Sequence, residues 1–388
     1  MDITIHPCKL TGNVTAIPSK SMAHRMLICA AFADSPTQLL CPESNEDIDA
    51  TADCLRALGA DILRTSEGFS VVPADRIPQE TELNCRESGS TLRFLLPVVG
   101  ALGVTATIRM TGRLPNRPLS PLWEEMERMG CCLSRPAENR ILCQGKLRPG
   151  TYSIAGNVSS QFISGLLFAF TLMDEKCELE IQGKLESAPY VRMTEDAIRL
   201  FFKNKPAPRQ VTVEGDWSNG AFWLAARELG SEVEVSGLHP LSVQGDRAFS
   251  QLLPMMRQSF ANISAADIPD LVPILSIVAA CCQGAVFSDI QRLRLKESDR
   301  VASVCAMIQS LGGKAEATEK TLTVYSTGLT GGTVDAVNDH RIAMSAAIAA
   351  TVCTEDVTVL GAECVKKSYP RFWEEYARLG GNYELYLR

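Results

Sequence analysis

One recurring sequence pattern limits the folds that this chain is able to adopt. A helix-like run ends in a step from a hydrophobic residue to glycine, and a short β-like run follows; the glycines of four such steps are Gly59, Gly130, Gly312 and Gly380. Glycine is favoured just after a helix, so a single junction of this kind is common. The spacing within each half of the chain is roughly 70 residues, however, and a period this long favours a repeated supersecondary unit.

The repeated unit reads as βαβαββ from its hydrophobic periodicity. In the first copy we predict strand, helix, strand and helix at 14–17, 21–33, 37–41 and 47–58, followed by two short strands. In later copies we predict strands at 104–109, 151–154 and 177–182, and helices at 118–129, 158–173 and 189–202. Degenerate copies ending near Phe201 and Gln258 lack the closing hairpin, around 203–210 and 259–266. Six units in two groups of three predict an α/β (α+β) protein with two similar domains and a cleft between them.

Composition narrows the class of protein. A length of 388 residues suggests two domains or one large one, and 46% hydrophobic with 21% charged residues excludes global disorder. The net charge of −7 argues against nucleic acid as a partner. The longest apolar run, 271–282, is too short for a membrane span, and no signal peptide is visible.

Cysteine and histidine usage points to a reducing compartment without a metal site. The fourteen cysteines are scattered, form no C-x-x-C motif and mostly lie in apolar stretches. None of the four histidines has a partner at metal-ligand spacing, so a zinc site is not expected. We therefore expect a cytoplasmic protein.

Basic residues gather where turns open helices, although the chain as a whole is acidic. Helix N-termini favour anions, and a nearby Lys or Arg makes a phosphate or carboxylate site. Each segment alone is better explained by ordinary N-capping, but the set predicts a small substrate with more than one anionic group. The segments are PSKSMAHR (18–25), ESGSTLR (87–93), LPNRPLS (114–120), LKESDR (295–300), NDHR (338–341) and KKSYPR (366–371).

The first of these segments carries the most information. Lys20 is able to reach a phosphate, Ser21 to cap the helix or bind ligand, and Arg25 lies on the same helix face as Ser21. The polar turn GNVSSQFISG (156–165) offers more hydrogen-bonding side chains than a cap needs. Asp270 and Glu297 would each be structural alone, as an N-cap and a charged helix start. Together, beside cationic groups, they form a candidate base and acid.

Three common enzyme signatures are missing from the sequence. No G-x-x-x-x-G-K-[ST] loop is present, which argues against a P-loop NTPase. No G-x-S-x-G elbow is present, which argues against an α/β-hydrolase. No G-x-G-x-x-G lies between a strand and a helix, so a dinucleotide-binding fold has no support.

Taken together, the segments resemble the 5-enolpyruvylshikimate-3-phosphate synthase family. PSKSMAHR and ESGSTLR are similar to two of its motifs, and RLPNRP, NVSSQF, ESAPY, IPDLVP, RLKESDR, NDHR and KKSYP follow in the family's order, from residue 2 to about residue 378. The resemblance implies an enolpyruvyl transferase-like inside-out α/β barrel fold with three βαβαββ units in each of two domains. One domain would span 18–214 and the other 1–17 plus 215–388.

The resemblance also implies an activity. Members transfer the enolpyruvyl group of phosphoenolpyruvate to the 5-hydroxyl of shikimate 3-phosphate and release phosphate, through a tetrahedral intermediate and without a metal or organic cofactor. The residues implied to hold phosphoenolpyruvate are Lys20, Gly89, Arg93, Arg117, Gln161, Arg300, Arg341 and Lys367. Those implied to hold shikimate 3-phosphate are Lys20, Ser21, Arg25, Ser159, Ser160, Gln161, Ser187, Asp270 and Lys296. Of the catalytic residues, Asp270 would accept the hydroxyl proton, Glu297 would protonate the methylene carbon, and Lys20 would lie between the two ligands. We expect a monomer.

Two departures and two alternatives remain open. Glu87 stands where many relatives have Asn, which puts its contact with phosphoenolpyruvate in doubt. Arg292 stands where an Asn often contacts shikimate 3-phosphate. The UDP-N-acetylglucosamine enolpyruvyl transferase family shares the fold, but it begins with a Lys-Asn pair and carries a loop Cys, both of which this chain lacks. A non-catalytic anion-binding relative is the other alternative; the presence of both Asp270 and Glu297 argues against it.

Overall fold

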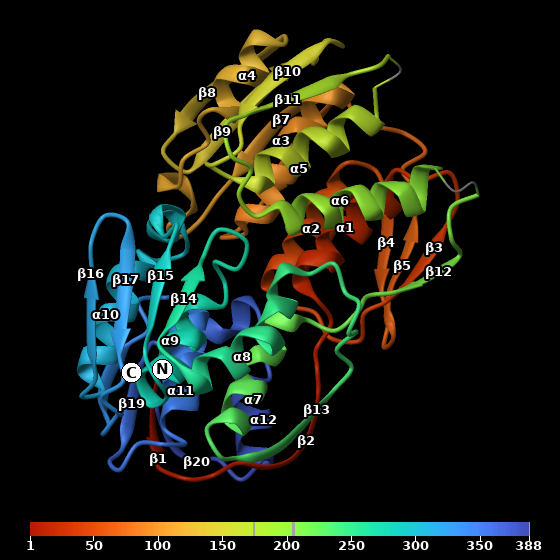
Figure 1. Cartoon of the computed structure of the whole chain (residues 1–388). Coiled ribbons are helices and arrows are strands. Elements are labelled where there is room, and N and C mark those ends of the chain that lie inside the picture. The colour runs from red at the N-terminus through yellow and green to blue at the C-terminus, as the bar shows by residue number, and fades with distance from the viewer. Residues whose placement is uncertain (174, 204–205, 388) are drawn as a thin grey trace. The chain divides into compact units, whose positions relative to one another are not determined.

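The computed structural model describes residues 1–173, 175–203 and 206–387. The chain forms two compact units. Unit 1 consists of Met1–Ile17 and Gly215–Arg388, and unit 2 consists of Pro18–Glu214. The chain therefore leaves unit 1 after its first two strands, completes unit 2, and returns. Each unit is described by itself below (Figure 1).

The described residues of unit 2 form three sheets, with strand orders β12-β3-β5-β4, β6-β7-β9-β8 and β10-β11. In both four-stranded sheets the first pair is parallel and the other pairs are antiparallel. This shared pattern is that of a βαβαββ unit. The elements are α1 (Lys20–Ala31), β3 (Thr37–Leu40), α2 (Glu46–Ala57), β4 (Asp61–Arg64), β5 (Gly68–Val72), β6 (Glu80–Asn84), α3 (Gly89–Leu102), β7 (Thr105–Arg109), η1 (Leu114–Asn116), α4 (Leu122–Arg128), β8 (Cys131–Ala137), β9 (Arg140–Gly145), β10 (Thr151–Ala155), α5 (Ser160–Thr171), β11 (Glu178–Gln182), α6 (Ala188–Ile198), η2 (Arg199–Lys203) and β12 (Gln210–Thr212).

Unit 1 repeats the pattern with the orders β18-β19-β1-β20, β14-β15-β17-β16 and β13-β2. Figure 1 shows β14, β15, β17 and β16 side by side. The two ends of the chain meet here, because β1 pairs with β20. The elements are β1 (Asp2–His6), β2 (Thr11–Thr15), α7 (Trp217–Glu228), β13 (Glu232–Ser236), η3 (Gly245–Ala248), α8 (Phe249–Gln258), β14 (Ala261–Ser264), α9 (Val272–Cys281), β15 (Ala285–Ser288), η4 (Gln291–Leu295), α10 (Arg300–Ser310), β16 (Lys314–Ala317), β17 (Thr321–Tyr325), β18 (Gly332–Asp335), α11 (His340–Ala349), β19 (Val357–Leu360), η5 (Ala362–Lys367), α12 (Phe372–Arg378) and β20 (Asn382–Tyr386).

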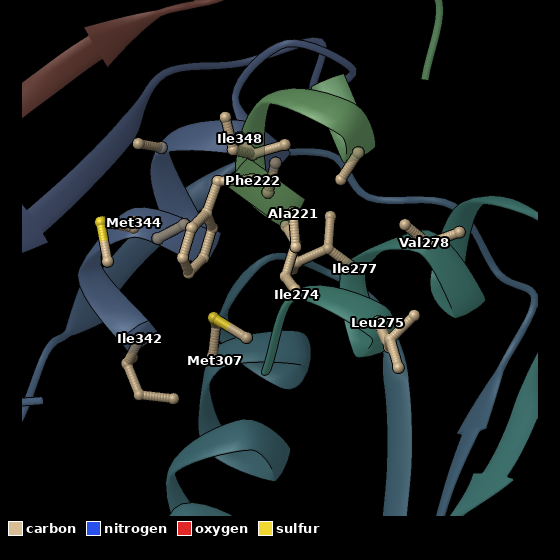
Figure 2. Close-up of a cluster of buried hydrophobic side chains, with 14 of the residues drawn as sticks. Ala221, Phe222, Ile274, Leu275, Ile277, Val278, Met307, Ile342, Met344 and Ile348 are labelled. Carbon is tan, nitrogen blue, oxygen red and sulfur yellow. The ribbon is translucent and has the colours of Figure 1, made fainter. Parts of the chain in front are cut away.

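Helices form the centre of each unit. All of α11 is buried, as is nearly all of α3 and α9, so these helices are surrounded on every side. Their sequences are correspondingly apolar all round, as in VPILSIVAAC of α9. In Figure 2 the side chains of Phe222, Ile274, Met307 and Ile342, from α7, α9, α10 and α11, gather in the core of unit 1. The start of each central helix is consequently held firmly by packing, which matters because most predicted ligand residues lie there.

The two predicted short copies have two-stranded sheets. β10 and β11 form one parallel pair, and β2 and β13 form the other. No closing hairpin follows α8, which is succeeded by β14 of the next unit. After α6 the described chain continues into η2, while residues 204 and 205 of the predicted 203–210 gap lie outside the described residues. The prediction of two hairpin-less copies is confirmed as far as the described chain extends.

One predicted strand was assigned to the wrong unit of the repeat. The strand expected at 14–17 belongs to β2, which pairs in parallel with β13 in unit 1. In the sheet of unit 2 the place of that first strand is taken by β12, from the end of the unit, which pairs in parallel with β3. Alternation of apolar and polar residues indicates a strand but does not say which strand it will pair with. The resemblance had already implied that the first strands belong with the C-terminal half.

All fourteen cysteines lie in the described chain and are free thiols. Among the described residues, no helix is both long enough and apolar enough to cross a membrane.

Candidate active site

Five of the sequence motifs begin a buried helix with a side-chain N-cap. Each cap accepts a hydrogen bond from a backbone N–H of the first turn, as short polar side chains do at this position. The first helix is capped by Ser19, so the suggestion that Ser21 caps it is wrong. The caps are Ser19, Ser88 and Ser159 in unit 2, and Asp299 and Asp339 in unit 1.

Two guanidinium groups meet over the start of α3 in unit 2. A Cβ built on Gly89 would lie 2.6 Å from Nη1 of Arg117 and 2.7 Å from Nη1 of Arg93. Arg93 donates to Oε1 of Gln161 at 3.0 Å and to the carbonyl of Pro118 at 3.1 Å. The structure thus brings together Gly89, Arg93, Arg117 and Gln161, four of the predicted ligands. Two guanidinium groups beside a helix N-terminus suit a carboxylate or phosphate.

Lys20 lies in the first turn of α1 and forms an ion pair across to α2. Its Nζ is 3.0 Å from Oδ2 of Asp47, and both side chains are mostly buried. Oγ1 of Thr91, in the first turn of α3, lies 3.4 Å from the carbonyl oxygen of Asp47. The starts of α1, α2 and α3 are therefore joined, and Lys20 lies on the same side of unit 2 as the Arg93 group.

Arg25 is a buried cation held by neutral groups. Its guanidinium donates to the hydroxyl of Thr194 at 2.8 Å and to the carbonyls of Tyr190 and Ser21 at 2.9 and 2.6 Å. Burial lowers the pKa of Arg25 to about 10, so it stays charged at neutral pH. A buried charge is expensive to maintain unless a counter-ion approaches it. The ties to Tyr190 and Thr194 place Arg25 beside α6.

The predicted serine ligands lie at the starts of the neighbouring helices. Ser159 caps α5 and accepts from the backbone N–H of Gln161 at 3.3 Å, and Ser160 is the first residue of that helix. Ser187 precedes α6 with a φ of 57°, in the left-handed region. A non-glycine residue with this backbone geometry is uncommon and often functional. The three serines lie near Arg25 through the packing of α6 against α1 and α5.

A buried chain of hydrogen bonds runs behind these helix starts. His24 Nδ1 is 2.7 Å from Oγ1 of Thr51, which is 2.7 Å from Oγ1 of Thr91, which donates to Ser88 at 2.7 Å. It links α1, α2 and the cap of α3. Burial, together with the charges of Lys20 and Arg25, lowers the pKa of His24 well below 6.5. His24 is therefore neutral in the folded protein.

We expect neutral His24 to make the protein sensitive to acid. Below pH 6.5 the unfolded chain binds a proton at this histidine and the folded chain does not, so stability falls as pH falls. The slope from one such group is at most about 1.4 kcal/mol per pH unit. His24→Asn, whose amide still reaches Thr51, is expected to flatten the decline in urea-unfolding free energy between pH 6.5 and 5.

His6 provides the matched control for this measurement. It is the last residue of β1 and is partly exposed, and a hydrogen bond with Asp356 raises its pKa. His6 therefore favours the folded state at low pH, and His6→Gln should steepen the decline rather than flatten it. A His24→Asn profile identical to wild type would show that His24 binds its proton in the folded protein.

In unit 1, three cationic side chains converge on Asp270. Its Oδ1 is 2.6 Å from Nη1 of Arg300 and 3.4 Å from Nζ of Lys296, and its Oδ2 is 3.2 Å from Nη2 of Arg341. The next helix, α9, is capped at Leu271 without a side-chain hydrogen bond. The N-cap interpretation of Asp270 is therefore wrong, and the carboxylate is committed to the cationic cluster instead.

Arg300 lies at the centre of this cluster. Its side chain is 1% exposed, and it bonds Asp339, which is 0% exposed, through Nε at 2.9 Å. Its Nη2 is 2.8 Å from Oε2 of Glu297. Ser298 donates to the same oxygen of Asp339 at 3.0 Å. A single buried guanidinium thus positions both predicted catalytic carboxylates, Asp270 and Glu297.

The charges in the cluster stabilise one another. Burial disfavours charge on Asp270, but Arg341, Lys296 and Arg300 outweigh it and hold the pKa of Asp270 well below 3.8. Burial also lowers the pKa of Lys296, and the charge of Asp270 offsets part of that shift. Burial opposes the charge of Arg300, yet Asp339, Glu297 and Asp270 raise its pKa well above the usual arginine value. Asp270 is consequently ionised at neutral pH.

The remaining predicted ligands of unit 1 lie around the start of α11. Arg341 is 3% exposed, and its Nη2 also donates to the hydroxyl of Ser218 at 2.9 Å. Lys367, at the end of η5, donates to the carbonyl of Asn338 at 3.0 Å. Asn338 directly precedes the cap of α11 and has a φ of 59°. Arg341 and Lys367 are thereby held at one turn.

Sequence reasoning did not single out three residues of these clusters. Asp47 holds Lys20, Asp339 holds Arg300, and Ser218 holds Arg341. Asp339 could have been predicted from the sequence, because it lies in the NDHR motif one residue before the helix. Ser218 lies in GDWSNGAFW (215–223), a polar turn before an apolar helix of the same type as NVSSQF. Their partners are more than 25 residues away in the chain, so the pairing itself needed the structure.

Solved structures with a similar fold place the chain in a class. An EPSP synthase from Acinetobacter baumannii aligns with a TM-score of 0.79 and 20% identity, over 99% of this chain and 100% of that one. The enolpyruvyl transferase NikO from Streptomyces tendae aligns with a TM-score of 0.77 and 17% identity, over 99% and 98% of the two chains. The fold is that of the enolpyruvyl transferases.

Sequence relatives make the assignment specific. The family model for EPSP synthase (3-phosphoshikimate 1-carboxyvinyltransferase) matches residues 5–265 and 251–376. Proteins named 3-phosphoshikimate 1-carboxyvinyltransferase from Clostridium perfringens and Clostridium kluyveri are 36% and 34% identical, each over 98% of this chain and 98% and 97% of their own lengths. The chain belongs to the EPSP synthase family, and the resemblance inferred from its motifs is confirmed.

Proposed function

We propose that the protein transfers the enolpyruvyl group of phosphoenolpyruvate to the 5-hydroxyl of shikimate 3-phosphate. The hydroxyl oxygen bonds to the central carbon of phosphoenolpyruvate while the methylene carbon takes up a proton. Loss of that proton and of inorganic phosphate then gives 5-enolpyruvylshikimate 3-phosphate. The observation that carries the proposal is the cluster in which ionised Asp270, together with Glu297, is held by Arg300 beside Lys296 and Arg341.

The proposal assigns phosphoenolpyruvate to the guanidinium groups of both units. In unit 2 it would bind Arg93, Arg117, Gln161 and the N–H groups above Gly89, which are already together. In unit 1 the further ligands would be Arg300, Arg341 and Lys367. Bidentate guanidinium groups suit a small molecule that carries one carboxylate and one phosphate.

Shikimate 3-phosphate is assigned to the serine-lined helix starts of unit 2. Arg25 supports this assignment because it is buried, charged and bonded to neutral groups, so an incoming anion would supply its counter-charge. Ser21, Ser159, Ser160 and Ser187 would add hydroxyl donors. Lys20, Gln161, Lys296 and Asp270 complete the proposed set.

The two carboxylates take different roles in the proposal. Asp270 is ionised by its cationic neighbours and would accept the proton of the attacking hydroxyl. Its basicity is low while three cations hold it, and substrate anions that bind Arg300 and Arg341 would release it from part of that charge. Glu297, bonded to Arg300, would exchange a proton with the methylene carbon. Positioning and fixed charges would supply the rest of the rate enhancement.

The test is phosphate release from phosphoenolpyruvate in the presence of shikimate 3-phosphate. Wild-type protein is expected to release one phosphate for each 5-enolpyruvylshikimate 3-phosphate formed, and none with either substrate alone. Replacing shikimate 3-phosphate by UDP-N-acetylglucosamine should give no phosphate. Binding of both substrates without release would favour the non-catalytic alternative.

Glu297→Gln is expected to bind both substrates and release phosphate about 10²- to 10⁴-fold more slowly than wild type, the range typical for loss of a proton-transfer group. The amide still accepts from Arg300, so calorimetric binding of both ligands should change little. Glu319→Gln, an exposed glutamate on the β16–β17 turn, is the matched control. Turnover of Glu297→Gln equal to that of the control would remove the proton-transfer role.

We also propose that the enzyme is a cytoplasmic monomer that does not bind nucleic acid. Free thiols throughout and a net charge of −7 support this view. Light scattering that gave a multiple of the chain mass, 42.2 kDa, would contradict the monomer.

A further inference from the structure

The side chain of Glu87 has a definite structural task in unit 2. Its Oε1 accepts a hydrogen bond from the backbone N–H of Arg113 at 3.3 Å. It also covers Gly112, since a Cβ on that glycine would lie 1.4 Å from the same oxygen. Gly112 has a φ of +57°, so its backbone also disfavours any other residue. The carboxylate and this glycine fit one another.

The segment that Glu87 holds is the one that carries Arg117. From Gly112 the chain enters η1, and the backbone N–H of Arg117 bonds the carbonyl of Leu114 at 3.1 Å. A second tie joins the same two segments, because the N–H of Thr111 donates to the carbonyl of Arg86 at 2.8 Å. One short loop therefore lies between the carboxylate of Glu87 and the guanidinium of Arg117.

The same segment also orients the second guanidinium. The carbonyl of Pro118, next to Arg117, accepts from Nη2 of Arg93 at 3.1 Å. Nη1 atoms of both arginines lie within 2.7 Å of where a Cβ of Gly89 would be. A shift of the loop would consequently move Arg117 directly and loosen Arg93, and both belong to the proposed phosphoenolpyruvate set.

We propose that Glu87 is a positioning residue, which clamps residues 111–118 so that Arg117 and Arg93 meet above the start of α3. Its carboxylate is bonded to the loop backbone and serves the substrate through these arginines. This inference rests on the proposed function for its kinetic consequence, but the clamp itself is a property of unit 2.

The clamp predicts a specific pattern of kinetic change. Glu87→Ala removes the acceptor and should raise the KM for phosphoenolpyruvate about tenfold, the effect of losing one hydrogen bond. The KM for shikimate 3-phosphate should stay within about twofold of wild type. Glu87→Gln keeps an oxygen that is able to accept from Arg113 and should remain within about threefold for both substrates. Glu82→Ala, an exposed glutamate on β6 paired with Arg109, is the matched control.

Gly112→Ala tests the other side of the clamp. It should raise the KM for phosphoenolpyruvate in the wild-type background, and the increase should be smaller in the Glu87→Ala background, where the clash is gone. Additive effects of the two substitutions would overturn the proposal. So would a Glu87→Ala enzyme whose KM for phosphoenolpyruvate equals that of Glu82→Ala.

Hydrogen exchange separates this inference from the proposed function. The backbone N–H groups of 111–114, 116 and 117 should exchange faster in Glu87→Ala than in wild type or Glu82→Ala, whether or not the enzyme turns over. If the wild-type protein is inactive but Glu87→Ala still exchanges faster than wild type, the proposed function is wrong and the clamp is supported. If the wild-type protein is active, and Glu87→Ala changes neither the exchange rates nor the KM for phosphoenolpyruvate, only the clamp is wrong.

Discussion

Asp270→Asn is expected to lower kcat by about 10²- to 10⁴-fold, the range for removal of a general base. The amide is nearly the same size, and its single oxygen still accepts a hydrogen bond from Arg300 while its NH2 group takes the place of the oxygen that faces Arg341. It has no negative charge with which to receive the proton of the 5-hydroxyl. The measurement is initial phosphate release at saturating concentrations of both substrates, which isolates kcat.

Asp267→Asn is the matched control, because Asp267 lies three residues earlier in the same loop and is exposed. It should retain wild-type kcat. Calorimetry with phosphoenolpyruvate should show equal or tighter binding to Asp270→Asn, since the variant removes a negative charge beside Arg300 and Arg341. A kcat for Asp270→Asn within a few-fold of the control would mean that another group accepts the proton.

Because the pKa of Asp270 is depressed, protonation of this carboxylate in the free enzyme does not explain a loss of activity between pH 5 and 9. A carboxyl group whose folded pKa lies well below 3.8 contributes stability that is complete above its unfolded pKa and disappears as pH falls through the folded value. Between pH 5 and 9 the free enzyme therefore keeps Asp270 ionised. Loss of activity of the free enzyme in that range has to come from other groups.

The repeated unit could be predicted because local patterns determine it. Each helix of a βαβαββ unit has its own cap and apolar face, so α2, α5 and α6 begin and end within a few residues of the predictions. Helix α4 begins four residues later than expected, because the stretch before it contains Pro118 and Pro121 and forms η1 and turns instead.

Strand pairing was harder to predict because it is not local. β12 completes the sheet of β3 from the far end of unit 2, and β1 completes the sheet of β19 and β20 from the start of the chain. Nothing in a four-residue alternating stretch specifies a partner so far away. The motif resemblance supplied the connection between the first strands and the C-terminal half, which periodicity alone did not.

For the site, the sequence indicated the residues but not the network that holds them. Charge and helix position drew attention to Arg300, Arg341 and Asp270. Their mutual distances, and the buried Asp339 behind them, follow from the packing of α9, α10 and α11. Glu87 is a second example: the sequence showed that this residue departs from the family motif, but only the structure shows that it accepts a hydrogen bond from the backbone N–H of Arg113.

Arg300→Met is expected to cost about 3–5 kcal/mol of stability, the range for removing one partner of a buried ion pair. Asp339 is 0% exposed and would lose its hydrogen bonds to Arg300, keeping only neutral donors such as Ser298. Asp270 and Glu297 would also lose a shared cation, so activity should be abolished. The measurement is urea unfolding at pH 7, with the midpoint and slope compared with wild type.

A second substitution distinguishes loss of charge balance from loss of packing. If the cost arises from the stranded carboxylate of Asp339, Arg300→Met/Asp339→Asn should recover part of the stability lost in Arg300→Met, because this fully buried side chain then carries no charge. If it arises from packing, the double variant should be less stable than either single one. Glu374→Gln, which breaks an exposed pair with Arg371, should change stability by no more than about 0.5 kcal/mol. An Arg300→Met protein as stable as this control would contradict the view that the charge of Arg300 holds the unit 1 cluster together. It would also remove the explanation of why Asp270 and Glu297 lie close to each other.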